Sequence, residues 1–282
     1  MQMTELHEGQ VRFWRAPDLD DLELLHARYS RCDFPRHIHE RYVIALMVGG
    51  AEELALGRCV YTVPAGRVVL INPGEAHRNR SVGDCGTAYR SFYPTAGMIS
   101  RLAACDDERG SSTPSFRAPI LCDPKLHVAL VQLHKRLERP SSSLESETAL
   151  SVNLRRLLPS DAAAPAGSNS GAERRQVRLA REYLDACYER NTSLSALAVL
   201  AGLSRFQLLR SFKKEVGLPP AQYQTHVRVR EAKRLLLTGC SLAETAVQVG
   251  FVDQSHFTRS FKRLTGVTPG VYASRNSIQD AL

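Results

Sequence analysis

The spacing of hydrophobic residues changes along the chain from short runs to helical intervals. In the first part, apolar and β-branched residues form brief segments between turn-forming residues, as in RYVIALMVGG (41–50), RCVYTVPAG (58–66) and RVVLINPGEAH (67–77). Segments of this length and spacing are typical of strands in an antiparallel sandwich or barrel. We therefore predict an antiparallel β-barrel for residues 1–125.

Leucine then recurs at intervals of three or four residues in LHVALVQLHKRL (126–137) and SLESETALSVNLRRLL (143–158). This spacing predicts a pair of amphipathic helices within residues 126–158. Their leucine stripes either close one end of the barrel or pair with a second subunit, and the sequence alone leaves both possibilities open. Because most soluble oligomers are twofold, the expected assembly is a homodimer.

The segment PSDAAAPAGSNSGAE (159–173) contains no large apolar side chain and is rich in Pro, Ala, Gly and Ser. This composition predicts a flexible linker between two independently folded parts. Residues 174–282 then form the second part, for which we predict an all-α fold. The expected fold class of the whole chain is α+β.

The second part contains an internal repeat. SLSALAVLAGL (193–203) aligns with SLAETAVQVGF (241–251), and SRFQLLRSFKKEVGLPPAQY (204–223) aligns with DQSHFTRSFKRLTGVTPGVY (253–272). Each copy predicts a helix, a tight turn that contains glycine, and a second helix that begins at a serine or aspartate cap. Two such helix-turn-helix motifs, joined by a long helix over 220–239, are typical of DNA binding.

The net charge of the chain is +8, and the whole of this excess lies after residue 170. Acidic and basic residues cancel in residues 1–170. A basic excess confined to one region is typical of a protein that binds a polyanion. A solvated basic face has the same composition, so charge alone does not decide between the two.

Residues 175–275 resemble the tandem DNA-binding domain of AraC/XylS-type transcription regulators. The resemblance is strongest at Gly250-Phe251, Asp253-Gln254-Ser255-His256-Phe257, Arg259, Phe261-Lys262, Gly266 and Thr268-Pro269. It implies double-stranded DNA as a partner, with RNA polymerase as a further candidate partner. The expected DNA-binding residues are Arg205, Phe206, Leu209, Arg210, Lys213 and Lys214 in the first copy, and Gln254, Ser255, Thr258, Arg259, Lys262 and Arg263 in the second.

The side-chain chemistry of the second copy supports base recognition. Glutamine can bind adenine through two hydrogen bonds, arginine can bind guanine, and Ser or Thr can donate or accept. Lysines and arginines at the helix ends suit phosphates. Phe206 and Leu209 of the first copy can contact a thymine methyl group or belong to the core, and Arg259 can instead form an ion pair with Glu244.

In the first part, HIHERYVIALMVGG (37–50) and YTVPAGRVVLINPGEAHR (61–78) resemble the cupin-like sensor domain that AraC-type regulators often carry. This resemblance implies a small β-barrel whose mouth holds a small-molecule effector. The guanidinium of Arg90 suits a ligand carboxylate or phosphate, or else a surface ion pair. The expected ligand-binding residues are His37, His39, Tyr42, Glu75, His77, Arg78, Arg90 and Tyr93.

Three of these residues, His37, His39 and His77, also suggest a metal site, because imidazoles two apart on a strand point the same way. Enzymatic cupins carry a glutamate four residues after the second histidine, and here that position is Val43. We therefore favour histidines that line a ligand pocket or satisfy hydrogen bonds, and we predict no metal and no cofactor. The alternative function is a metal-dependent cupin enzyme fused to a DNA-binding tail.

The remaining features exclude several protein classes. The seven cysteines form no CxxC pair, so neither a zinc ribbon nor a disulfide framework is expected. The N-terminal residues lack the apolar core of a secretory signal, and no apolar run reaches the roughly 18–20 residues of a membrane span. We predict a cytoplasmic transcription regulator that responds to a small molecule, does not bind membranes and is not an enzyme.

Overall fold

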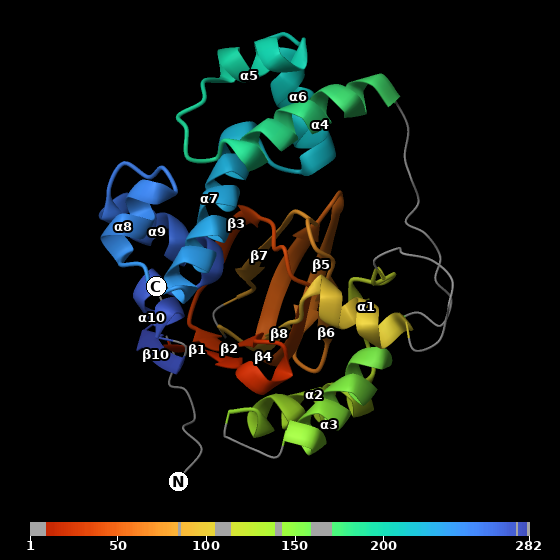
Figure 1. Cartoon of the computed structure of the whole chain (residues 1–282). Coiled ribbons are helices and arrows are strands. Elements are labelled where there is room, and N and C mark those ends of the chain that lie inside the picture. Colours follow the sequence, from red (N-terminus) through yellow and green to blue (C-terminus); the bar gives the residue numbers. More distant parts are fainter. Residues whose placement is uncertain are drawn as a thin grey trace. The chain divides into compact units, whose positions relative to one another are not determined.

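The computed structural model describes residues 10–83, 86–104, 114–138, 143–158, 171–274 and 276–280. It confirms the α+β class and contains two units, each of which has its own elements (Figure 1). The first unit contains an antiparallel sheet with helices α1, α2 and α3. The second contains helices α4 to α10 together with Phe34–Ile38. Within the described ranges, no helix has the length and hydrophobicity needed to cross a membrane.

One long strand organises the sheet, whose order is β10-β1-β2-β8-β4-β6-β9. The first half of β4 pairs with β6 and β8, and its second half pairs with β5 and β7. A register shift between Met47 and Gly49 separates these halves, and such an irregularity bends a strand. The strands are β1 (Gln10–Ala16), β2 (Leu22–Tyr29), β3 (Asp33–His37), β4 (Val43–Leu56), β5 (Cys59–Pro64), β6 (Val68–Ile71), β7 (His77–Ser81), β8 (Thr87–Tyr93), β9 (Ile120–Leu121) and β10 (Asn276–Asp280).

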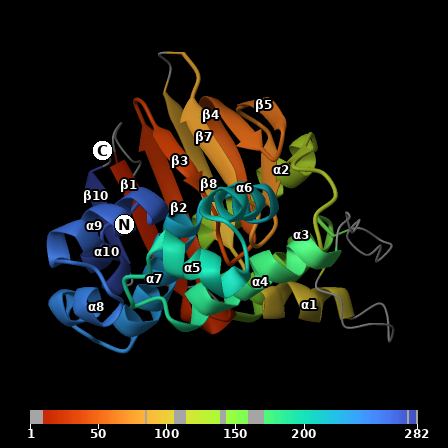
Figure 2. The same cartoon turned by 90° about the horizontal axis from the view of Figure 1, so that it is seen from above.

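The last strand comes from the far end of the chain. In β10, Asn276 lies opposite Trp14 and Asp280 opposite Gln10, so that β10 extends the sheet beyond β1. Figures 1 and 2 both show the two strands side by side. Residues 276–280 thus depart from the all-α fold predicted for 174–282, because the outer edge of β1 provides backbone groups that pair with them. The chain leaves this unit after α3, forms the helices of the second unit and returns to the same sheet.

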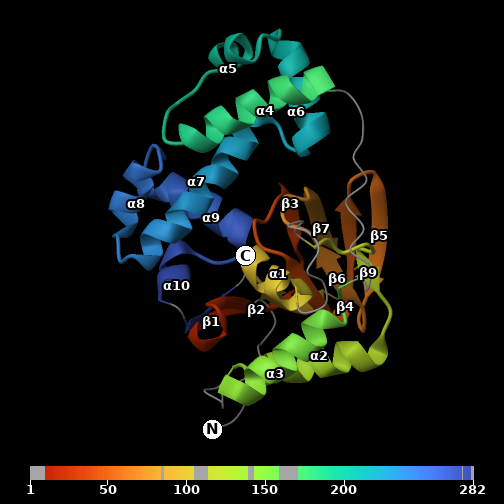
Figure 3. The same cartoon turned by 45° about the vertical axis from the view of Figure 1, so that its right-hand side comes forward.

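Helices α2 (Pro124–Arg136) and α3 (Ser143–Arg155) lie along one face of the sheet (Figure 3). Their leucines are buried in one core with Trp14, Ile44 and Phe92 of the strands. The leucine stripes thus cover the sheet of their own chain. The same unit contains α1 (Ala96–Ala104) and the short 3-10 helix η1 (Pro17–Leu19).

The second unit contains the two predicted helix-turn-helix motifs on either side of a long helix. The predicted linker, 159–173, lies outside the described residues up to 170, and its last residues are already helical. The helices are α4 (Gly171–Ala186), α5 (Leu194–Ala201), α6 (Arg205–Val216), α7 (Pro220–Leu237), α8 (Leu242–Gln248), α9 (Gln254–Thr265) and α10 (Pro269–Ala273).

The second helix of each motif begins and ends as its sequence predicts. Ser204 forms a capping box with Gln207 at the start of α6, and the Asp253 side chain accepts a hydrogen bond from the His256 amide at the start of α9. Both helices end at a glycine with a left-handed backbone. Because the inward side chains recur four residues apart, each helix has one buried face, formed by Leu208 and Phe212 in α6 and by Phe257 and Phe261 in α9.

The loop between α4 and α5 is fixed to α7 by side chains that bind its carbonyl groups. Gln224 Nε2 donates to the carbonyl oxygens of Tyr188 and Arg190, at 3.1 and 2.7 Å. Arg228 Nε donates to the same Tyr188 oxygen at 2.7 Å, and its guanidinium lies over the Phe251 ring. These contacts connect the loop of the first motif with the turn of the second.

Gly250 in that turn contacts the same loop through its backbone. Its φ is +84°, and a Cβ at this position would lie 2.2 Å from the Glu189 carbonyl oxygen. The equivalent Gly202 of the first motif has a φ of +65°, but a Cβ there would approach only the flexible Gln176 side chain, at 4.0 Å. Both positions therefore favour glycine, and only Gly250 also needs it for a backbone contact.

We expect Gly250→Ala to destabilise the protein much more than Gly202→Ala. The Gly202 variant bears only the backbone strain, about 1–2 kcal/mol, whereas the Gly250 variant must also displace the Glu189 backbone. Urea unfolding of the full chain, followed by circular dichroism at the helix band, measures both effects. Equal losses in the two variants would contradict the inferred contact between the motifs.

Candidate nucleic-acid interface and effector site

Helix α9 presents the predicted base-reading residues to solvent. Gln254, Ser255 and Arg259 are exposed and Thr258 is half-buried, on the side away from the buried phenylalanines. The alternative partner of Arg259, Glu244, instead accepts hydrogen bonds from the backbone and side chain of Ser241 at the start of α8. Over the described ranges, no ion pair joins Arg259 to Glu244. The exposed Arg259 side chain is thus positioned to bind a partner outside the protein.

Helix α6 presents an unusual mixture of apolar and basic side chains. Phe206 is 74% exposed and Leu209 is 38% exposed, whereas Leu208 between them is fully buried. Of the two interpretations of Phe206 and Leu209, membership of the core is therefore not supported. Arg205 and Arg210 flank them and are also exposed.

The predicted phosphate-binding residues lie in the last turns of the two helices. Lys213, Lys214 and Arg263 are exposed, and Lys262 is half-buried. A cation there also interacts favourably with the C-terminal end of the helix dipole. Their positions leave the flexible ammonium and guanidinium groups accessible to a charged backbone.

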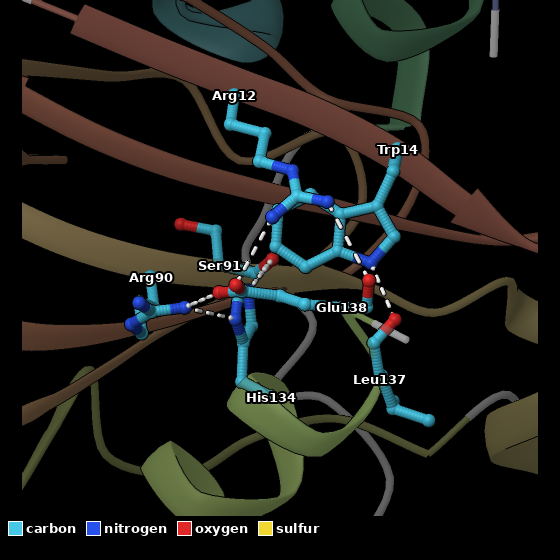
Figure 4. A network of polar contacts seen from close by, with 7 residues as sticks. All are labelled: Arg12, Trp14, Arg90, Ser91, His134, Leu137 and Glu138. Atoms are coloured by element: carbon cyan, nitrogen blue, oxygen red, sulfur yellow. Dashed lines mark hydrogen bonds and ion pairs between the residues drawn. The ribbon is translucent and has the colours of Figure 1, made fainter. Parts of the chain in front are cut away.

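Arg90 lies in a buried network beneath the end of α2, shown in Figure 4. Its guanidinium forms an ion pair with Glu138 and donates to His134 Nδ1 at 3.1 Å. Arg12 also contacts Glu138, at 3.1 Å, while the Trp14 indole donates to the Leu137 carbonyl at 2.9 Å. This network holds α2 against the sheet. The charge of Arg90, for which the sequence offered a ligand or a surface ion pair, is instead paired with buried Glu138.

His134 shows how the network holds α2 without an additional charge. Its Nε2 lies 3.2 Å from the Ser91 carbonyl oxygen and donates to it, which leaves Nδ1 to accept from Arg90. Burial, with the nearby Arg90 charge, lowers the pKa of His134 well below its usual value. The imidazole is therefore neutral at physiological pH and serves as a hydrogen-bonded spacer.

Three further predicted ligand residues have partners within the protein. Arg78 is exposed and forms an ion pair with Asp33 at 2.8 Å. A carboxylate oxygen of Glu75 accepts a hydrogen bond from the backbone N–H of Asn72 at 2.9 Å. The Tyr42 hydroxyl donates to the Pro114 carbonyl oxygen. These contacts support structural roles for Tyr42, Glu75 and Arg78.

Two of the three predicted histidines lie together in the first unit, where the His39 and His77 rings stack with their centroids 5.2 Å apart. His37 belongs to the segment Phe34–Ile38 of the second unit. Nδ1 of His37 bonds to the Pro35 carbonyl, and Nδ1 of His77 to the Glu75 carbonyl, at 2.8 and 2.9 Å. If Nδ1 carries the proton, Nε2 is the acceptor of each ring, and burial lowers the pKa of His37 to about 4.

Such neutral imidazoles are suited to accept hydrogen bonds, and their nitrogens are also donors that transition metals accept. The position of the carboxylate in enzymatic cupins is Val43, whose buried apolar side chain offers no ligand atom. His39 and His77 thus offer ring nitrogens to the same side of the sheet.

A group of polar and aromatic residues lies on the side of the sheet opposite the α2 network. Because side chains alternate along β8, Tyr89 and Tyr93 face away from Arg90 and Phe92. The Tyr29 and Tyr89 rings are 6.1 Å apart, and His39 contacts both His77 and Tyr93. We call this group the polar face, and its members are Tyr29, His39, Glu52, His77, Asn79, Thr87, Tyr89, Ser91 and Tyr93.

Glu52 is the most consequential of the polar-face residues that sequence reasoning missed. It is only 4% exposed, and among the described residues its carboxylate accepts a single hydrogen bond, from Asn79 Nδ2 at 3.3 Å. Burial raises its pKa to about 7. The signal in the sequence was the adjacent pair Glu52-Glu53 in a strand, because alternation must turn one of the two inward.

The comparisons with known proteins agree with this architecture. A model described as an AraC-like ligand binding domain matches residues 21–152, and one described as a helix-turn-helix domain matches residues 197–275. The HTH-type transcriptional regulator YbfI of Bacillus subtilis is 31% identical over 224 residues, which cover 79% of this chain and 81% of that protein. The transcriptional activator RhaS of Escherichia coli O81 is 27% identical over 268 residues, covering 93% and 94%.

A crystal structure of an apo variant of ToxT from Vibrio cholerae has a similar fold, with a TM-score of 0.56, 14% identity, and coverage of 97% of this chain and 100% of that one. Fold, matched domains and relatives thus define a DNA-binding transcription regulator with a ligand-binding domain. The chain belongs to the AraC family.

We expect the stability of the protein to fall as pH rises from about 5 to 8, with Glu52 as one cause. A carboxyl group whose folded pKa is raised stabilises the fold below its unfolded pKa, and this contribution is lost as pH rises through the folded value, about 7. Glu52→Gln should therefore stabilise the protein at pH 8 by on the order of 3 kcal/mol and have little effect at pH 4.5.

Glu53→Gln is the matched control, because Glu53 is the neighbour on the opposite side of β4 and forms an exposed ion pair with Arg80. Urea unfolding at several pH values compares the two variants. A Glu52→Gln protein that showed the same pH dependence as the wild type would contradict the assignment of a raised pKa to Glu52.

Proposed function

We propose that the protein controls transcription by placing α6 and α9 in the major groove of double-stranded DNA, in response to a small molecule bound by the N-terminal domain. The observation that carries the proposal is the repeated surface of these helices, each with a buried inner side, an exposed outer side and basic residues at its end. Helix α7, with 18 residues, is about 27 Å long. This length supports binding of the two motifs at successive major grooves, which are about 34 Å apart.

In the second motif, we assign base recognition to Gln254, Ser255, Thr258 and Arg259 and phosphate binding to Lys262 and Arg263. Glutamine and arginine have the donor and acceptor patterns that distinguish adenine and guanine in the major groove. The basic residues at the helix end add affinity that does not depend on sequence. In the first motif, Arg205 and Arg210 can contact polar groups of the DNA, and Lys213 and Lys214 suit phosphates.

Arg259→Ala and Lys262→Ala should have different effects on DNA binding. The preferred site is first selected from random duplexes with the wild-type protein. Arg259→Ala should then lose about 1–3 kcal/mol on this site, because a guanine contact is removed, and much less on scrambled DNA. Lys262→Ala should lower the affinity for both duplexes by similar factors. The slope of log affinity against log salt concentration should decrease by about the amount expected for one lost phosphate contact.

Fluorescence anisotropy on the two duplexes measures these affinities, and circular dichroism verifies that each variant is folded. If Arg259→Ala lowers the affinity for both duplexes equally, Arg259 contacts a phosphate and does not read a base. An unchanged affinity in both variants would show that α9 does not enter the groove.

Phe206 should recognise the methyl group of a thymine in the selected site. Replacing that thymine with deoxyuridine removes only the methyl group, and its burial is worth about 0.8 kcal/mol, or roughly fourfold in affinity. Phe206→Ala should bind the thymine and deoxyuridine duplexes equally. Thymines in the α6 half of the site are substituted one at a time in the same anisotropy assay, and Lys214→Ala serves as the control that retains the discrimination. If no deoxyuridine substitution affects the wild type, Phe206 does not contact a methyl group.

The remaining parts of the proposal follow from the family and the site. A structure of wild-type ToxT from Vibrio cholerae contains a bound unsaturated fatty acid, which supports a small-molecule effector in a domain of this fold. A regulator that binds bacterial promoter DNA acts in the cytoplasm and meets RNA polymerase there. We propose no catalytic role for the chain and include the homodimer as its default assembly, formed through a surface other than the buried leucine stripes.

A further inference from the structure

We propose that the effector is an organic cation, a small molecule with a protonated amine that pairs with Glu52 in the polar face. This inference deepens the proposed function, because it specifies the chemistry of the molecule that the sensor domain recognises. It reverses the ligand charge for which Arg90 was considered in the sequence, where a carboxylate or phosphate was the alternative to a surface ion pair.

The first step of the argument is where the charges lie. Arg90 is on the opposite side of the sheet, where Glu138 neutralises it, and Arg78 is exposed and paired with Asp33. The nine members of the polar face include one carboxylate and neither a lysine nor an arginine. The other buried carboxylate on this side of the sheet, Glu23 beside Tyr93, is already paired with Arg15 and Arg41. Across the described parts of the chain, no cationic side chain contacts Glu52. An anionic ligand bound to the polar face would therefore meet a buried acidic group, whereas a cation would neutralise it.

The second step is the hydrogen-bonding capacity of the polar face. Thr87 is almost completely buried, yet its hydroxyl oxygen has no hydrogen-bond partner among the described residues. The Glu52 carboxylate has only the long contact from Asn79. Buried polar groups are nearly always hydrogen-bonded in proteins, so these two groups are suited to accept hydrogen bonds from a bound molecule. Carboxylate and hydroxyl oxygens are acceptors that suit a donor-rich ammonium group.

The third step is the aromatic composition of the polar face. Tyr29, Tyr89 and Tyr93 lie close enough to Glu52 for its charge to raise the pKa of each phenol, although burial is the larger cause. The faces of aromatic rings attract cations, and sites for organic ammonium groups commonly combine such rings with a carboxylate. The three tyrosines and Glu52 provide both elements on one side of the sheet.

The proposal is tested with small molecules that share a carbon skeleton and differ in charge. The probes are butylamine, butanol and butyrate, and benzylamine, benzyl alcohol and benzoate, added to the full-length protein. Thermal unfolding and isothermal titration calorimetry measure binding. At least one amine should raise the unfolding temperature of the wild type, whereas the alcohol and carboxylate with the same skeleton should not.

Two variants assign the effect to Glu52. Glu52→Gln should lower amine affinity at least tenfold, and Glu53→Gln, on the opposite side of the same strand, should retain it. If the carboxylates bind more tightly than the amines, if Glu52→Gln binds the amine as well as the wild type, or if no amine binds at all, the proposal is wrong.

The pH dependence gives a second readout. Because Glu52 must ionise to pair with the amine, affinity should rise roughly tenfold between pH 6 and pH 8. The other groups near Glu52 stay neutral there, since burial raises the pKa of Cys32 to about 11 and those of Tyr29, Tyr89 and Tyr93 further above 10. The polar face also contains the imidazoles of His39 and His77, and Glu23, beside Tyr93 on the same side of the sheet, is paired with Arg15 and Arg41. His77→Gln is included to separate the contribution of the imidazoles. A wild-type affinity that does not change with pH would overturn the pairing with Glu52.

Binding of the selected DNA site by the wild type without any probe is measured in parallel. Absence of DNA binding would contradict the proposed function and leave the amine result intact. Normal DNA binding without any response to amines would contradict only the identity of the effector class.

Discussion

The contact between the Gly250 backbone and the Glu189 carbonyl constrains the whole DNA-binding unit. The two helix-turn-helix motifs are separated in sequence, and each has its own small core. A turn that meets a loop backbone-to-backbone leaves no room for a side chain, so the second motif is fixed against the end of α4. Arg228 and Gln224 strengthen this junction, because they bind the carbonyl groups of the same loop from α7. The spacing of the two DNA-reading helices is thus set by a few backbone atoms and not by α7 alone.

The fixed arrangement of the two motifs offers an explanation for the exposure of Phe206 and Leu209. Exposed aromatic side chains on a basic surface are unfavourable in water, and binding a partner removes them from it. Since α6 and α9 are held in one unit, binding of α9 to a groove brings α6 and its apolar residues to the same duplex. The polar contacts proposed for the second motif and the apolar contacts proposed for the first are therefore complementary in chemistry.

The sequence predicted the DNA-binding unit far better than the sensor site. Helix caps, glycine turns and inward residues four apart are local signals, and Ser204, Asp253, Phe257 and Phe261 occupy the predicted places. The sensor site depends on which face of a strand each residue occupies and on what covers that face. Neighbours such as Arg90 and Tyr89 point in opposite directions. Only the packing of α2 shows that Arg90 faces this helix and that Tyr89 faces the polar side of the sheet. The burial of Glu52 depends on contacts between strands distant in sequence, so composition and spacing could not reveal it.

The pairing of β10 with β1 makes the DNA-binding helices an insertion in the sensor domain instead of an appendage. A domain joined by one flexible connection samples many orientations, whereas a segment anchored at both ends loses much of that rotational freedom. Without β10, the helices would be attached to the sensor domain at one end only. DNA binding would then cost more orientational entropy.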